Sequence, residues 1–141
     1  MRRKTGFAIT AGLATLLITA GIFFWLVWLS PWTYQRPASL PEVSPGPHQV
    51  FVYGTLRHAS VRWIVYGRSG SPSAATLEGY ERNDLDLIRA RGASVEGLVL
   101  TVDRRELKRL DRYERLGIRY SRERVELGDG QQAWVYQRLD D

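Results

Sequence analysis

The sequence predicts an α+β domain of short strands and flanking helices, preceded by one transmembrane helix. Three observations support this prediction. Residues 7–29 contain no charged side chain. Beyond residue 48, short segments alternate between apolar and polar residues, as half-buried strands do. A helical leucine stripe follows an N-cap signature near residue 103. We therefore assign residues 1–30 to a transmembrane signal anchor, 31–48 to a Pro-rich linker and 49–141 to the domain.

The uncharged segment Phe7–Leu29 is 23 residues long. As a helix it spans roughly 34 Å, enough to cross the hydrocarbon core of a bilayer. Aromatic residues gather at its far end, where an interfacial belt is expected: Trp25, Trp28, Trp32 and Tyr34. A cleaved signal peptide is the competing interpretation, but its apolar region is shorter and ends at small residues. We therefore favour an uncleaved anchor.

Basic residues predict the orientation of this anchor. Arg2, Arg3 and Lys4 precede the span, whereas only Arg36 follows it before the domain. Positive residues stay on the cytoplasmic side, so the N-terminus is expected inside and the domain outside. In a bacterium this predicts a single-pass protein of the inner membrane with a periplasmic domain.

Small residues form a stripe along the predicted membrane helix: Ala8, Gly12, Thr15 and Thr19. Such a stripe permits close packing against a partner helix. Small residues are also common in membrane helices generally, and that explanation is the simpler one. The next segment, Ser30–His48, contains five prolines and is expected to be an extended, semi-rigid tether.

Composition excludes several classes of function. The chain has no cysteine and two histidines, which excludes a thiol nucleophile, a disulfide framework and a histidine-rich metal cluster. The net charge of +5 divides into +3 before residue 49 and +2 after it. The domain itself is nearly balanced, so we expect no nucleic-acid partner.

The elements expected in the domain follow from local patterns. Strands are predicted at 50–53, 74–80 and 95–102, a short helix at 57–66, and a closing hairpin at 122–127 and 132–136. Residues 82–93 are expected to be irregular, with Leu85, Leu87 and Ile88 turned inward. Asp103 and Glu106 form a capping-box pair that begins a helix extending to about Arg115.

The segment Val50–Arg57 ends a buried strand in a glycine turn. Val50, Phe51, Val52 and Tyr53 favour a strand, and Gly54 permits a backbone geometry that a Cβ would resist. Backbone N–H groups beyond such a strand have no ladder partner and can form a nest for an anion. An ordinary tight turn explains the spacing equally well.

A second candidate feature is a carboxylate in the helix from Arg104 to Arg115. At 100° per residue, Glu114 falls on the apolar face marked by Leu107 and Leu110, and Asp111 lies at the edge of that face. Burial would raise the pKa of the Glu114 carboxyl and make it a better base near neutrality. A partly buried glutamate paired with an arginine is the alternative.

The order and spacing of six segments resemble the gamma-glutamylcyclotransferase-like family, closest to its gamma-glutamylamine cyclotransferase branch. The matching segments are Val50–Arg57, Leu77–Tyr80, Val95–Gly97, Leu110–Glu114, Tyr120–Arg122 and Ala133–Tyr136. The resemblance implies a small mixed β-barrel with flanking short helices. It also implies that the backbone of Tyr53, Gly54, Thr55 and Leu56 cradles a glutamyl group.

The same resemblance implies an activity. Glu114 matches the catalytic carboxylate of the family, and Tyr120 matches a position near the pocket. The reaction would cyclise a gamma-glutamyl amine, amino acid or peptide to 5-oxoproline and release the amine, with no metal or organic cofactor. The alternative is a non-catalytic binding module or an accessory subunit of a membrane complex, since a fold alone does not fix a function.

Overall fold

The computed structural model describes residues 2–139. Met1 of the predicted anchor and residues 140–141 of the predicted domain therefore lie outside the described part. The chain divides into two compact units, Met1–Gln35 and Arg36–Asp141. The second unit thus starts at Arg36, whereas the sequence assigns residues 31–48 to a linker.

The first unit is helical. Helix α1 (Arg2–Phe24) continues into a π-helical turn, η1 (Trp25–Leu29). The stretch Ala8–Leu29 is long and apolar enough to span a membrane by length and composition. The hydroxyl of Thr15 donates to the carbonyl of Ala11, which removes an unsatisfied donor from this apolar surface.

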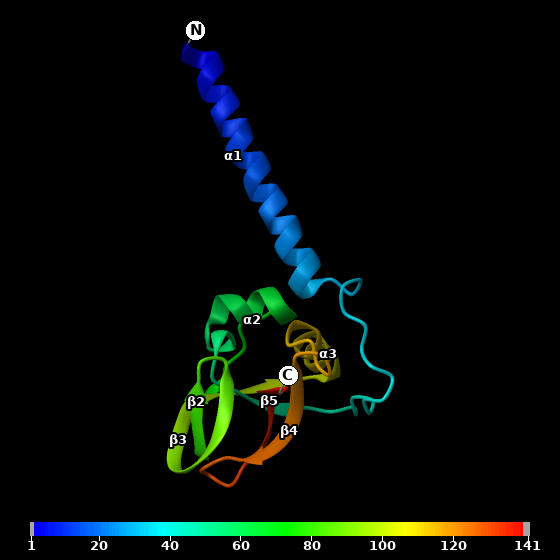
Figure 1. Ribbon diagram of the computed structural model, residues 1–141, viewed down its shortest axis with the longest axis vertical. Coiled ribbons are helices and arrows are strands. Elements are labelled where there is room, and N and C mark those ends of the chain that lie inside the picture. Colours follow the sequence, from blue (N-terminus) through cyan, green and yellow to red (C-terminus); the bar gives the residue numbers. More distant parts are fainter. Residues whose placement is uncertain (1, 140–141) are drawn as a thin grey trace. The chain divides into compact units, whose positions relative to one another are not determined.

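The second unit is a curled five-stranded half-barrel with short helices. Its elements are β1 (His48–Val52), η2 (Thr55–Arg57), α2 (Ala59–Tyr66), β2 (Ser73–Asn83), β3 (Asp86–Val102), α3 (Arg104–Tyr113), β4 (Tyr120–Glu126) and β5 (Gln132–Arg138). The strand order is β2-β3-β1-β5-β4 (Figure 1). The amide of Gly128, just after β4, donates to the carbonyl of Thr76 in β2 at 2.9 Å and so links the two edges of the sheet.

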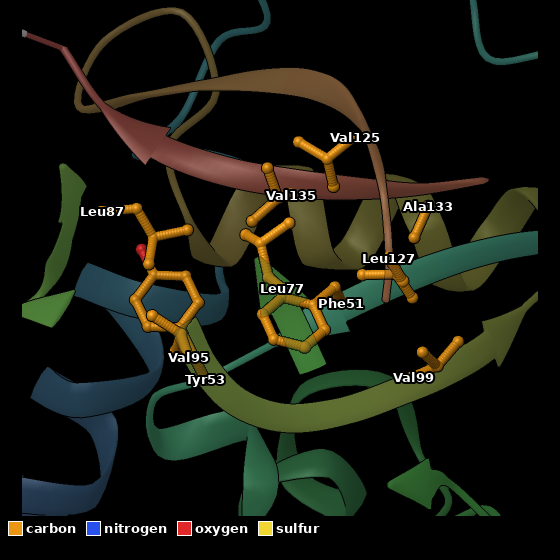
Figure 2. Packing of buried hydrophobic residues seen from close by; sticks show 10 residues of the cluster. All are labelled: Phe51, Tyr53, Leu77, Leu87, Val95, Val99, Val125, Leu127, Ala133 and Val135. Carbon is orange, nitrogen blue, oxygen red and sulfur yellow. The ribbon is translucent and has the colours of Figure 1, made fainter. Parts of the chain in front are cut away.

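Strand β1 is the centre of the sheet. It pairs antiparallel with β3 and parallel with β5, and four of its five residues are buried. Phe51 and Tyr53 point into the main apolar cluster, with Leu77, Leu87 and Val135 (Figure 2). A strand covered on both faces needs the continuous apolar run that the sequence contains here.

The long hairpin of β2 and β3 corrects the sequence prediction for residues 82–93. Except for the turn at residues 84–85, these residues belong to the two strands, whose pairing resumes after a register shift between Glu78 and Tyr80 and continues to Asn83 and Asp86. Only Leu87 is turned inward, at 6% exposure, whereas Leu85 and Ile88 are 56% and 42% exposed. Most of the β2 end of this hairpin is solvent-accessible, so its polar sequence carries no clear alternation.

The predicted capping box at the start of α3 is confirmed. The Asp103 carboxylate accepts from the amide of Glu106 at 2.8 Å, and the Glu106 carboxylate accepts from the amide of Asp103 at 2.9 Å. Helices α2 and α3 pack against each other beside the sheet (Figure 1). The cap fixes where α3 begins, and therefore which residues lie at its far end.

Gly97 marks a place where two strands approach too closely for a side chain. A Cβ there would lie 2.4 Å from the carbonyl oxygen of Val52 and 2.7 Å from the Phe51 ring. We expect Gly97→Ala to lower the free energy of unfolding by about 2 kcal/mol, because the backbone of β1 must shift. Urea unfolding of the full chain in detergent measures this, and an unchanged midpoint would contradict it.

Candidate active site

Glu114 lies at the C-terminal end of α3, where it is the C-cap residue. Helix α3 itself ends at Tyr113, one residue before Glu114. Glu114 still has helical backbone angles (φ −80°, ψ −5°), so its side chain leaves the backbone in the direction expected for a helical residue. Arg115 then reverses the chain with φ 52°, a left-handed geometry that costs a non-glycine residue on the order of 1 kcal/mol. Glu114 therefore lies directly before a sharp reversal of the chain.

Burial raises the pKa of the Glu114 carboxyl to about 7. Glu114 is only partly buried as a residue, so it remains accessible from solvent although its carboxyl is desolvated. No compensating cation or hydrogen-bond donor to this carboxyl is found among the described residues. A carboxyl with a pKa near neutrality can both accept and return a proton at physiological pH.

Four tyrosines lie close enough to this carboxyl to respond to its charge. Its charge raises the pKa of four tyrosines, in each case in addition to the larger effect of burial: Tyr53, Tyr113, Tyr120 and Tyr136. These phenols therefore stay protonated at neutral pH. Tyr53 directly follows β1, and the other three come from α3, β4 and β5, so the curl of the sheet brings distant segments to one place.

The predicted glycine turn lies at the same place. Gly54 (φ −108°, ψ −139°) breaks the extended backbone, and η2 begins at Thr55. The hydroxyl of Thr55 lies 3.2 Å from that of Tyr113, which joins this turn to the end of α3. Within the described part of the chain, the amides of Thr55 and Leu56 donate to no protein group. Free amides at the start of a helical turn suit an anion or a developing oxyanion.

The tip of the β2–β3 hairpin closes around this turn. The carbonyl of Leu85 accepts hydrogen bonds from Tyr53 at 3.2 Å and from Tyr120 at 3.5 Å. The guanidinium of Arg82 donates to the carbonyl of Tyr53 at 3.1 Å and fixes the peptide that precedes Gly54. The tip of this hairpin, within the residues 82–93 that were expected to be irregular, is thus part of the candidate site.

Asp111, one turn before Glu114, is fully buried rather than at the edge of the helix face. Its carboxylate accepts from Arg36 at 2.8 Å, from Arg122 at 2.5 Å and from the hydroxyl of Tyr136 at 2.6 Å. The pairing with arginine that the sequence leaves open for Glu114 is therefore realised at Asp111. Arg36 is 75 residues and Arg122 is 11 residues from Asp111 in the sequence, so no local pattern reveals these pairs.

The structure brings together Glu114, Tyr53, Thr55 and Tyr120 of the predicted site residues. Gly54 and Leu56 belong to the same turn, and the Leu56 side chain is buried. Sequence reasoning did not single out Tyr113, Tyr136 or Arg82, and it placed Asp111 at the edge of the helix face. For Tyr113 a signal existed, because it precedes Glu114 in the Leu110–Glu114 segment.

An open groove of about 520 Å³, lined by Arg57, His58 and Glu96 among others, adjoins η2 but does not include Glu114.

The raised pKa of Glu114 predicts a pH dependence of stability. Its folded-state pKa of about 7 exceeds the ordinary value of 4.5, so the folded protein binds more protons between these pH values. The free energy of unfolding should therefore fall as the pH rises from 4.5 to 8. After allowance for partial exposure, the loss is on the order of 2 kcal/mol. Glu114→Gln removes this dependence, so the difference between the two proteins, measured by urea unfolding, isolates it. A difference independent of pH would contradict the prediction.

The comparison with protein families identifies the domain. The sequence model of gamma-glutamyl cyclotransferase, AIG2-like, proteins matches residues 50–141. The chain belongs to this family. Membership makes the domain a gamma-glutamyl cyclotransferase-type enzyme and agrees with the curled half-barrel fold. No curated protein matches the chain.

Solved structures support the same fold. The domain is similar to an Arabidopsis thaliana protein with 28% identity and a TM-score of 0.59, covering 72% of this chain and 69% of the other. It is similar to a gamma-glutamyl cyclotransferase with 15% identity and a TM-score of 0.57, covering 67% and 68%. A Pyrococcus horikoshii protein has 23% identity and a TM-score of 0.52, covering 67% and 80%. The last two likenesses show the fold alone.

Proposed function

We propose that this gamma-glutamyl cyclotransferase-type domain cyclises a gamma-glutamyl amine, amino acid or peptide to 5-oxoproline, as in the gamma-glutamylamine cyclotransferase branch of the family. One observation carries the proposal. A carboxyl whose pKa is about 7 lies beside a turn with free backbone amides, within the segment that matches the family. Glu114 is the proposed general acid and base.

The proposed mechanism begins with the substrate's α-ammonium group, which cannot attack until it loses a proton. Glu114 accepts that proton. The free amine attacks the γ-carbonyl carbon, so a C–N bond forms within the glutamyl group and an oxyanion develops. The amides of Thr55 and Leu56 stabilise this charge. The attacking nitrogen releases its second proton to solvent, the bond to the leaving amine breaks, and Glu114 returns the first proton to the leaving nitrogen.

Orientation supplies a further part of the proposed rate enhancement. An extended gamma-glutamyl chain must curl so that its amine reaches its own γ-carbonyl, and holding it curled removes an entropy cost. The tyrosines around Glu114 remain protonated, and their hydroxyl oxygens can accept hydrogen bonds from the substrate's amine. Thr55 lies 3.2 Å from one of them, Tyr113, so turn and helix end act on the same ligand.

The direct test offers the purified full chain gamma-glutamyl amines, gamma-glutamyl amino acids and glutathione, and measures 5-oxoproline. Release from at least one class is the expected result. Gamma-glutamyl peptides with a free α-amine, such as those derived from peptidoglycan, form a further substrate class for an exported domain. The same peptides with an acylated α-amine are the matched control, since they cannot cyclise. A folded protein inactive on every substrate would instead support a binding or accessory role.

The pH profile of this activity follows from the pKa of Glu114. The free enzyme needs Glu114 as a carboxylate, and its pKa is about 7. We expect kcat/KM to fall about tenfold per pH unit below that value. An acid limb centred near pH 4.5 would show that Glu114 is not the titrating base.

We also propose that the domain lies outside the cytoplasm, attached to the inner membrane by the stretch Ala8–Leu29. Its length and apolar composition support a membrane span. Arg2, Arg3 and Lys4 before it support a cytoplasmic N-terminus. A reporter enzyme that is active only in the periplasm, fused to the C-terminus, should be active. Activity of a cytoplasm-specific reporter at the same position would reverse the orientation.

A further inference from the structure

A segment that connects the apolar helix to the domain packs against the end of α3. We call this segment, Arg36–Val43, the strap. Val43 is buried, at 3% exposure. The ring of Pro37 and the side chain of Leu40 lie so close to Gly117 that a Cβ there would be 2.8 Å from Pro37 Cγ and 3.1 Å from Leu40 Cδ1. Gly117 therefore gives the strap a close-fitting seat just beyond the helix.

The guanidinium of Arg36 fastens the strap at two points. One nitrogen, Nη1, donates to Asp111 Oδ2 at 2.8 Å, and the other, Nη2, donates to the carbonyl of Pro41 at 2.7 Å. The first bond joins the strap to α3 and the second folds the strap on itself. Only an arginine has two outward donors in a fixed planar arrangement, so a lysine cannot reproduce both bonds.

Asp111 extends this connection into the sheet. Its Oδ1 atom accepts from Arg122 in β4 and from Tyr136 in β5, and its side chain is 1% exposed. The guanidinium of Arg122 in turn lies 4.9 Å from the centre of the Trp134 ring. Strap, helix and both C-terminal strands thus meet at one buried carboxylate. Removing one partner of a buried ion pair lowers the stability of the fold strongly, because the other charge is left buried and uncompensated.

Glu114 lies between the two places that the strap holds. Asp111 precedes it by one helical turn, and Gly117 follows it at the end of the reversal. The amide of Leu116 donates to the Asp111 carbonyl at 2.9 Å, and the amide of Gly117 donates to the Tyr120 carbonyl at 2.7 Å. The turn contains the left-handed Arg115, so it needs support from outside to persist.

We propose that Arg36 is a positioning residue for Glu114, and that the strap is part of the functional unit and not a passive tether. The inference rests on the proposed role of Glu114 for its effect on turnover, but the placement of Glu114 can be tested without turnover. Arg36→Met removes both fastening bonds and keeps an apolar stem of similar length. Arg104→Met is the matched control, because Arg104 joins α3 to the strap residue Glu42 through an exposed ion pair at 3.2 Å.

The decisive measurement is the titration of the Glu114 carboxyl by NMR in the full chain in detergent, assigned by its loss in Glu114→Gln. Loss of a nearby cation would by itself raise the pKa of Glu114. A displaced turn that admits water would lower it toward the ordinary range. We expect a lower pKa in Arg36→Met and no change in Arg104→Met. The tyrosines that face Glu114 are the same in both variants, so the shift reports the position of the turn.

Turnover gives a second readout where a substrate is available. Arg36→Met should lower kcat about tenfold with a smaller effect on KM, because misplacement of a reacting group affects the chemical step. Arg36→Lys keeps the charge and one of the two hydrogen bonds, so its kcat should lie between those of wild type and Arg36→Met. It is the variant to measure if Arg36→Met does not fold. An unchanged or raised pKa of Glu114 in the folded variants would overturn the inference. An inactive wild-type protein would refute the proposed function instead, and the titration would still stand.

Discussion

Replacing Glu114 with glutamine is expected to reduce 5-oxoproline release by about a thousandfold while the domain stays folded. The size of the effect is that of removing a positioned general acid and base. Glutamine has nearly the same shape and fills the same space beside the tyrosines. It has no proton to exchange near neutral pH, so the α-ammonium of the substrate stays protonated and cannot attack.

The same substitution should make the protein more stable above pH 7. Wild-type Glu114 must then be a desolvated carboxylate, for which the described residues supply no compensating partner, and its pKa of about 7 reflects that cost. A neutral amide avoids the cost. Loss of activity together with equal or greater resistance to urea at pH 8 therefore separates a catalytic role from a structural one.

Glu114→Asp is the matched variant, since it keeps the charge and withdraws the carboxyl by one methylene. It should retain more activity than Glu114→Gln, at about a hundredfold below wild type, because geometry is lost but proton transfer is not. A 5-oxoproline assay with both variants on one substrate gives the comparison. Full turnover by the glutamine variant would overturn the assignment of the base.

Elements whose signal is local could be predicted from the sequence. The capping box at Asp103 and Glu106 involves residues three apart, and the buried strand around Val50 has an uninterrupted apolar run. The direction of Glu114 also follows from local spacing, because it is set by its distance from Leu107 and Leu110 along one helix.

Features that depend on distant segments could not be predicted in this way. Helical phase places Asp111 and Glu114 on neighbouring parts of one face, but it does not show which carboxylate meets an arginine. That depends on Arg36 and Arg122, which reach Asp111 only after the strap and β4 have packed. The tip of the β2–β3 hairpin was missed because its polar side chains face water, although its Leu85 carbonyl holds Tyr53 and Tyr120.

The largest expected effect on stability comes from Asp111→Ala. The change would leave the guanidiniums of Arg36 and Arg122 and the hydroxyl of Tyr136 without their shared acceptor, and the Arg122 side chain is only 9% exposed. Breaking a buried pair by removal of one partner costs about 3–5 kcal/mol. A domain of this size has a total stability of about 5–15 kcal/mol, so much of the folded population would be lost near body temperature.

A compensated variant distinguishes loss of the charge partner from loss of packing. Asp111→Leu combined with Arg122→Met replaces the pair with apolar groups of similar volume, and buried ion pairs replaced in this way often retain or gain stability. The double variant should therefore be more stable than Asp111→Ala by at least about 2 kcal/mol in urea unfolding. Glu123→Ala removes an exposed carboxylate from β4 and should change stability by less than about 0.5 kcal/mol. Equal destabilisation by Asp111→Ala and the double variant would show that the uncompensated Arg122 charge is not what makes Asp111→Ala costly.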